Sequence, residues 1–163
     1  ITQGGRVIRR IKNRDGRLRF YRALRYGTCV CSIRRDSQRR ANIWFSTLFG
    51  GGTNYAHGED TLFLCDAFRR GLRVYTSSFC LGTCAKDAST CFHGFDEKYF
   101  HDQGVLYRAA FGAAAAPLCL RFCLKRYSAY RGEMTFFRAL RAMYRGTRET
   151  PSDKRPQRGT GAQ

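Results

Sequence analysis

The sequence has no long apolar run, no apolar leader and few acidic side chains. No uninterrupted apolar run approaches the roughly 20 residues of a membrane-spanning helix. The first forty residues are polar and rich in arginine, so we expect no signal peptide in this stretch. Twelve acids against thirty lysines and arginines leave a formal charge of +18. Such a surplus raises the hypothesis of a nucleic-acid or anionic-lipid partner.

Paired Cys-x-x-Cys motifs are also missing, although the chain has eight cysteines. Cys29 and Cys31 are separated by one residue, and Cys119 and Cys123 by three, which does not make a zinc ribbon. A disulfide framework is typical of short secreted chains. We therefore interpret the cysteines as small buried apolar residues in a reducing compartment. A zinc module is the alternative, and metal analysis would test it.

The residues that are present are sufficient for one packed core. Hydrophobic residues make up 43% of the chain and aromatic residues 14%, which excludes a wholly disordered polycation. The charge is uneven: residues 1–40 carry thirteen bases and two acids, whereas residues 59–104 carry seven acids and five bases. From residue 105 onward, twelve bases face three acids. A continuous nucleic-acid surface would not need the acidic middle, whereas a chemical site would use it.

Apolar periodicity predicts a mixed α/β chain that ends in basic helices. Gly50 follows the predicted strand or turn over residues 43–49. Gly71 follows the predicted helix over residues 59–70, where a left-handed helix end is expected. The predicted strands cover residues 28–34 and 72–76, with a strand or turn over 43–49; the predicted helices cover 18–26, 36–41, 59–70, 105–112, 118–130 and 134–144.

Glu59 and Asp60 stand at the predicted start of one helix, directly after a glycine-rich loop. Acids at a helix N-terminus are favoured by the helix dipole by about 0.3–1 kcal/mol, so this pair alone indicates only a helix start. Three consecutive glycines, residues 50–52, allow close backbone approach. The surrounding pattern is more specific.

Two segments together resemble the acceptor-side half of bacterial family 2 glycosyltransferases. The first, residues 42–76, reads NIWFSTLFGGGTNYAHGEDTLFLCDAFRRGLRVYT, and the second, residues 89–107, reads STCFHGFDEKYFHDQGVLY. The resemblance extends over about residues 28–146. It implies an α/β fold with an incomplete GT-A-like (Rossmann-like) sheet and a C-terminal helical region.

The resemblance also implies a domain organisation. A basic N-terminal segment, 1–27, precedes the acceptor-side part of a GT-A domain, 28–104. An amphipathic helical region, 105–146, and a disordered tail, 147–163, follow.

The implied activity is an inverting transfer of sugar from a nucleotide-sugar donor to a glycan or lipid-linked acceptor. By motif position Asp60 matches the catalytic base, and Glu59 precedes it in the family's Glu-Asp pair. A base must lie within hydrogen-bond reach of the acceptor hydroxyl, and a loop-to-helix junction presents a carboxylate in that way.

The acceptor pocket is expected around the same loop. Gly50, Gly51, Gly52 and His57 would border it. Trp44 would either stack on a sugar or pack in the core.

The chain departs from the family pattern in its donor half. The family holds a divalent cation, Mg or Mn, through an Asp-x-Asp motif, but the sequence has no Asp-x-Asp, and we assign no metal ligands in it. Together with Ile1 in place of a start methionine, the missing Asp-x-Asp predicts a C-terminal portion that is inactive alone. On the acceptor side, Cys91 stands where the family usually has tryptophan, and Ser78 stands near its usual proline.

The basic helices after residue 105 have two interpretations. They pack on the catalytic domain, or their arginine-flanked apolar faces bind an anionic membrane surface. The expected location is cytoplasmic, with peripheral attachment at the inner face of the plasma membrane. A basic nucleic-acid-binding module is the alternative function. Nucleic acid is not the expected partner, because no recognised binding motif is present. His93 and His101 are expected on the surface or in packing.

Overall fold

The computed structural model describes residues 15–23, 26–27, 31–78 and 94–151, together with the backbone of residues 2–3 and 6–7. Its elements follow in chain order: β1 Thr2–Gln3, β2 Arg6–Val7, β3 Gly16–Arg17, α1 Phe20–Ala23, α2 Arg35–Ala41, α3 Glu59–Arg69, β4 Tyr75–Thr76, α4 Glu97–Phe111, the 3₁₀ turn η2 Gly112–Ala114, α5 Ala115–Tyr130 and α6 Phe136–Gly146.

Helices and strands are both present, as the sequence predicts, but the strands described are short. They form two antiparallel pairs, β1 with β2 and β3 with β4, and in the second pair Gly16 lies opposite Thr76. The strand predicted over residues 72–76 is therefore confirmed at its end, and it pairs with the basic N-terminal segment.

The strand predicted over residues 28–34 is wrong for residues 31–34, and residues 28–30 lie outside the described part. Arg34 has extended backbone, with φ −70° and ψ 121°, but it precedes α2 instead of joining a sheet. Extended backbone forms a strand only when a neighbour completes its hydrogen bonds. Cys31, predicted to be buried, is exposed for the same reason.

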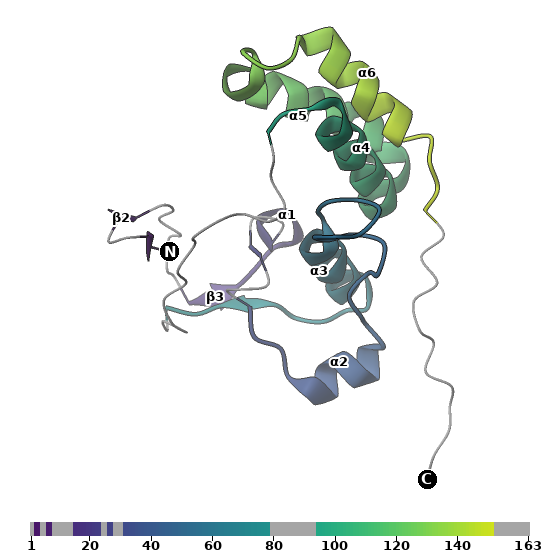
Figure 1. Cartoon of the computed structure of the whole chain (residues 1–163). Helices are drawn as coiled ribbons and strands as arrows, with labels where there is room; N and C mark the ends of the chain where they lie inside the picture. The colour runs from purple at the N-terminus through teal and green to yellow at the C-terminus, as the bar shows by residue number, and fades with distance from the viewer. Residues whose placement is uncertain are drawn as a thin grey trace.

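The C-terminal helices α4, α5 and α6 pack against one another around a common core (Figure 1). Its largest buried side chains are Phe100 from α4, Tyr130 from α5 and Met143 from α6. Cys119 and Cys123 are fully buried there as free thiols, which confirms the packing interpretation for this pair. Burial raises the pKa of Cys119 to about 12, so its thiol stays protonated and unreactive.

Two glycines set the close approach of α4 and α6. A Cβ added at Gly104 would overlap the carbonyl of Met143, and one added at Gly146 would overlap the carbonyl of His101. The two backbones therefore meet where no side chain separates them.

Helix α4 begins at Glu97, eight residues before the predicted start at residue 105. Asp96 explains this boundary, because its side chain accepts a hydrogen bond from the Tyr99 amide at 2.7 Å. The other predicted helix near it is confirmed more closely: Pro117 lies in the first turn of α5, where its missing N–H costs nothing.

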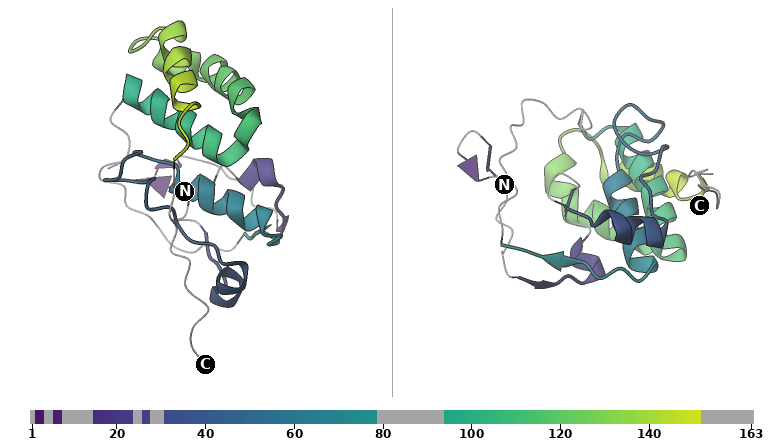
Figure 2. Two further views of the ribbon diagram at one scale, coloured as in Figure 1. Left: turned by 90° about the vertical axis from the view of Figure 1, so that its right-hand side faces the viewer. Right: turned by 90° about the horizontal axis from the view of Figure 1, so that it is seen from below.

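The helix α3 packs on the other side of α4 (Figure 2). Leu62 and Cys65 from α3 meet Val105 and Leu106 from α4, with Phe49 from the preceding loop. In a smaller cluster, Ile43 packs against Phe63 and Ala67 of α3. Helix α4 is therefore covered by α3 on one side and by α5 and α6 on the other, which explains why it is buried nearly all round.

The helical residues Glu97–Tyr130, taken together, are long and apolar enough to cross a membrane, with a mean hydropathy of 1.2. Apolar runs in the sequence do not predict this length, because no uninterrupted run is long enough. The structure divides the stretch at Gly112, whose φ of +58° and ψ of −124° end α4. The two halves are separate packed helices, and 28% of the apolar window is buried within the protein.

Candidate acceptor site

The candidate site begins at the N-terminus of α3, where Glu59 and Asp60 form the first turn as predicted. Gly58 precedes them with φ +117°, and a Cβ there would lie 2.6 Å from Cδ1 of Leu106. A glycine is therefore required both for the backbone angle and for space against α4. The helix start is fixed by this close approach to α4.

The triglycine loop closes on itself before it reaches α3. The Gly50 amide donates to the Tyr55 carbonyl at 2.9 Å, and the Tyr55 amide donates to the Leu48 carbonyl at 3.0 Å. The Thr53 hydroxyl donates within the same loop, at 2.8 Å from the Leu48 carbonyl oxygen. The loop is thus a compact turn with defined hydrogen bonds.

The three glycines do not play equal parts in the site. Gly50 is buried with φ +126°, and a Cβ on it would lie 3.3 Å from the carboxyl carbon of Glu59. Gly51 and Gly52 are exposed, and a Cβ at Gly52 would meet no atom within 4 Å. The structure therefore brings Gly50 and Glu59 together and leaves the other two at the loop surface.

Asp60 holds a carboxylate oxygen that the described residues do not satisfy. Its Oδ1 is buried and has no hydrogen-bond partner among them. Buried polar atoms in native proteins are nearly always paired, so an orphan of this kind requires an explanation.

His57 lies between the loop and α4, and burial determines its protonation. Its Nε2 is 3.1 Å from Oε1 of Gln103, and its ring stacks on Tyr99 with centroids 5.1 Å apart. Burial lowers the pKa of His57 below its usual 6.5, although the Gln103 contact and the charges of Asp102 and Glu59 oppose this. We assign the Nε2–H tautomer from the Gln103 contact. In this tautomer the buried Nδ1, which has no partner in the described part of the chain, is an acceptor.

A buried carboxylate on α4 holds the loop in place. Asp102 is 1% exposed, and its Oδ2 accepts from the Ala56 amide at 3.0 Å and from Lys98 Nζ at 2.7 Å. Lys98 Nζ also donates to the Asn54 carbonyl at 2.9 Å. We call this group the Asp102 brace (Asn54, Ala56, Lys98 and Asp102). The brace fixes the residues just before Glu59. The buried negative charge of Asp102 is compensated by Lys98 on the same helix and by the Ala56 amide in the loop.

Glu149 extends this network from beyond the end of α6. Its carboxylate accepts from the Tyr55 hydroxyl at 2.9 Å and lies 3.0 Å from Nε2 of His101. Partial burial and the Glu149 carboxylate raise the pKa of Tyr55 to about 12, so the phenol remains a donor. Glu149 belongs to the segment predicted as a disordered tail, whose residues 152–163 lie outside the described part. His101 is partly exposed and lies between the carboxylates of Glu149 and Asp102, and His93 lies outside the described residues.

Trp44 lies between α2 and the triglycine loop and is half-buried. Its Nε1–H donates to Oδ1 of Asn42 at 2.9 Å. Asn42 adopts the left-handed conformation that ends α2, with φ +48°. The indole is therefore held at the end of α2, and its stacking on a sugar stays a prediction.

Sequence reasoning missed Asp102, Gln103, Lys98 and Glu149. The spacing of Lys98 and Asp102 by four residues signals a helical ion pair, but it does not show that the pair reaches a loop more than forty residues away. Within residues 15–23, 26–27, 31–78 and 94–151, no group of three or more His, Cys, Asp or Glu side chains is placed to hold a metal ion.

Comparison with known proteins adds no relative. No protein-family model matches the chain, and neither curated proteins nor solved structures give a significant match.

Proposed function

We propose that this chain is the acceptor-side portion of an inverting glycosyltransferase, with Asp60 as its base. The substrate classes are a nucleotide-sugar donor and a glycan or lipid-linked acceptor. The proposal rests on the resemblance of residues 42–76 and 89–107 to family 2 glycosyltransferases. It includes the finer expectation of a GT-A-like sheet.

The observation that supports it best is the unpaired Oδ1 of Asp60 at the start of α3. In the proposed reaction an acceptor hydroxyl donates to this carboxylate and transfers its proton there. The hydroxyl oxygen bonds to the anomeric carbon of the donor, and the nucleoside diphosphate departs with the electrons of the broken bond. The proton transfer from the acceptor hydroxyl to Asp60 requires no other residue of this chain.

The surrounding residues would position the base. Gly50 lies against the carboxylate of Glu59, and the Asp102 brace holds the loop that leads into α3. The unpaired Nδ1 of His57 would accept from a second hydroxyl of the acceptor. Mg or Mn would neutralise the leaving diphosphate in a full-length enzyme. The described residues provide no ligand set for it.

A glycan array probed with the full 163-residue chain tests the acceptor assignment. We expect retention of a defined set of glycans, reduced about tenfold by Asp60→Asn, because a bond to a charged group contributes about 1.5–3 kcal/mol. Asp36→Asn is the matched control, since Asp36 is an exposed acid on α2. We also expect no transfer from nucleotide sugars by the chain alone.

Two results would contradict the proposal. Turnover of a nucleotide sugar at an enzyme-like rate by the chain alone would refute the missing donor half. Absence of any glycan binding would refute the acceptor assignment.

A basic nucleic-acid-binding module is the second candidate, and α2 is the observation that favours it. This helix buries no residue, and Arg35, Arg39 and Arg40 are exposed on it. Filter binding across a salt series distinguishes the two candidates: tight retention with a steep salt slope favours nucleic acid.

A further inference from the structure

The helix α5 has two apolar sides, and packing uses one of them. Cys119 and Cys123 are fully buried in the core formed with α4 and α6. On its other side, Leu120 is 40% exposed and Leu124 is 61% exposed. A helix that only covered a core would carry polar residues there. The exposed leucines are therefore an excess that the fold itself does not explain.

These leucines belong to a continuous surface, the α5 stripe, which we define as Pro117, Leu120, Leu124 and Tyr127. Tyr127 is 45% exposed, and its ring lies 6.2 Å from that of Phe136 at the start of α6. Phe136 in turn lies 5.6 Å from Phe137, which is 81% exposed. Exposed apolar groups thus continue from α5 onto α6.

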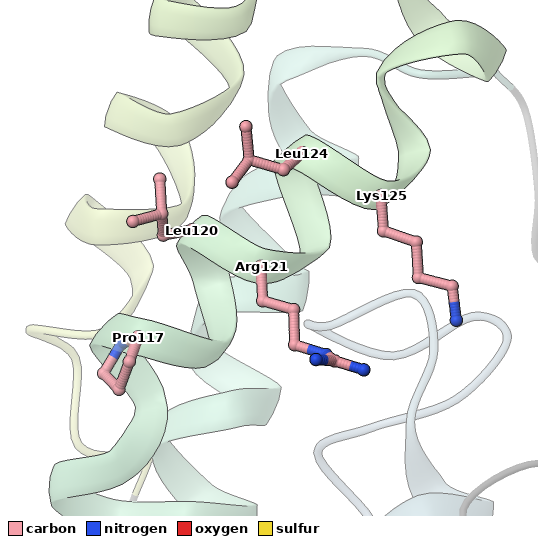
Figure 3. A pocket seen from close by; sticks show the side chains of 5 residues that line it. All are labelled: Pro117, Leu120, Arg121, Leu124 and Lys125. Carbon is pink, nitrogen blue, oxygen red and sulfur yellow. The ribbon is translucent and has the colours of Figure 1, made fainter.

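Basic side chains run directly along the α5 stripe. Pro117, Leu120 and Leu124 line a shallow hollow together with Arg121 and Lys125. Figure 3 shows the two leucines on one side of α5 and the two basic side chains directed to the other. Helix α5 holds three basic residues and no acid. Leucines flanked by long cationic side chains match an interfacial helix, whose apolar groups enter a bilayer while the cations meet lipid headgroups.

We propose that the α5 stripe is a docking surface for an anionic membrane, on which α5 lies parallel to the bilayer plane. Charge complementarity favours this occupant, because Arg121 and Lys125 would meet anionic headgroups while the leucines enter the bilayer. The proposal is independent of the reaction assigned to Asp60, since α4 separates α5 from α3 (Figure 1).

Vesicle co-sedimentation of the full chain tests the proposal. We expect binding to vesicles of phosphatidylcholine mixed with phosphatidylserine, and little binding to phosphatidylcholine alone. The double variant Arg121→Gln, Lys125→Gln should bind roughly 25-fold more weakly, at about fivefold per basic residue near the surface. The double variant Leu120→Ser, Leu124→Ser should lose at least about tenfold at the same net charge.

The control separates a specific surface from the general attraction of a chain of charge +18. The double variant Arg39→Gln, Arg40→Gln removes the same charge from exposed positions on α2 and should lose much less. All the substituted side chains of α5 are exposed, so circular dichroism should report unchanged folding in each variant.

Three outcomes would overturn the proposal. In the first, the leucine variant binds anionic vesicles as well as the wild type. In the second, the α2 control loses as much as the Arg121 and Lys125 variant. In the third, size-exclusion chromatography with light scattering finds a dimer that the leucine variant abolishes without any change in vesicle binding, which would assign the stripe to a second copy of the chain.

Discussion

At the scale of single residues, His57 couples folding to pH through its burial. Burial lowers the pKa of His57 below 6.5 in the folded chain, so the unfolded chain binds more protons. The free energy of unfolding should therefore fall as pH decreases through 6.5 towards the folded pKa, with a slope of at most about 1.4 kcal/mol per pH unit. Urea unfolding at a series of pH values measures this.

The variant His57→Gln isolates that contribution. Glutamine does not titrate. The free energy of unfolding of this variant should therefore depend less steeply on pH near 6.5 than that of the wild type, because the contribution of the His57 proton is lost. The same slope in both proteins would mean that another group is responsible and that His57 is not desolvated as described.

Glu149 gives a second prediction at this scale. Tyr55→Phe and Glu149→Gln should each cost about 0.5–1 kcal/mol of unfolding free energy, a modest amount because the Glu149 side chain is 47% exposed. The double variant should cost less than the sum, since both substitutions remove one hydrogen bond. Additive losses in a double-mutant cycle would show that Tyr55 and Glu149 do not interact in solution.

At the scale of elements, the crossing of α4 and α6 depends on glycine. Gly104→Ala should destabilise the chain by about 1–3 kcal/mol or more, because the added methyl group would overlap the Met143 carbonyl, which is backbone and cannot rotate away. Gly132→Ala is the control, since a Cβ there meets no atom within 4 Å and should change stability little. Thermal unfolding compares the two, and equal midpoints would contradict the close crossing.

The helix ends show what the sequence could predict. Gly58 and Gly71 mark α3, and its apolar face follows from local spacing, so the prediction of this helix succeeds. The start of α4 was missed although Asp96 is a local cap signal. The strand predicted over residues 28–34 is wrong at residues 31–34, because a strand depends on a distant partner, which spacing within one segment does not reveal.

Only part of the candidate site could be predicted from the sequence. The position of Glu59 and Asp60 at a helix start follows from the motif, and the structure agrees. The Asp102 brace could not be predicted, because it joins residues 46 positions apart. The hydrogen bonds between this brace and the loop form only when α4 lies beside the loop.

At the scale of the whole molecule, the described helices separate three surfaces. Helix α3 carries the candidate base on one side of α4, the exposed leucines of α5 lie on the other, and α2 exposes arginines. The charge of +18 thus belongs to more than one surface. In the arrangement that we propose, the membrane and the acceptor bind at different places on one chain.

The central claim is that Asp60 receives the acceptor hydroxyl, and a double-mutant cycle on binding tests it most directly. Isothermal calorimetry would compare an array-identified acceptor with its analogue deoxygenated at the reacting hydroxyl, each with wild type and with Asp60→Asn. Deoxygenation should weaken binding to the wild type about tenfold and binding to Asp60→Asn hardly at all. Equal loss in both proteins would show that the hydroxyl does not meet Asp60.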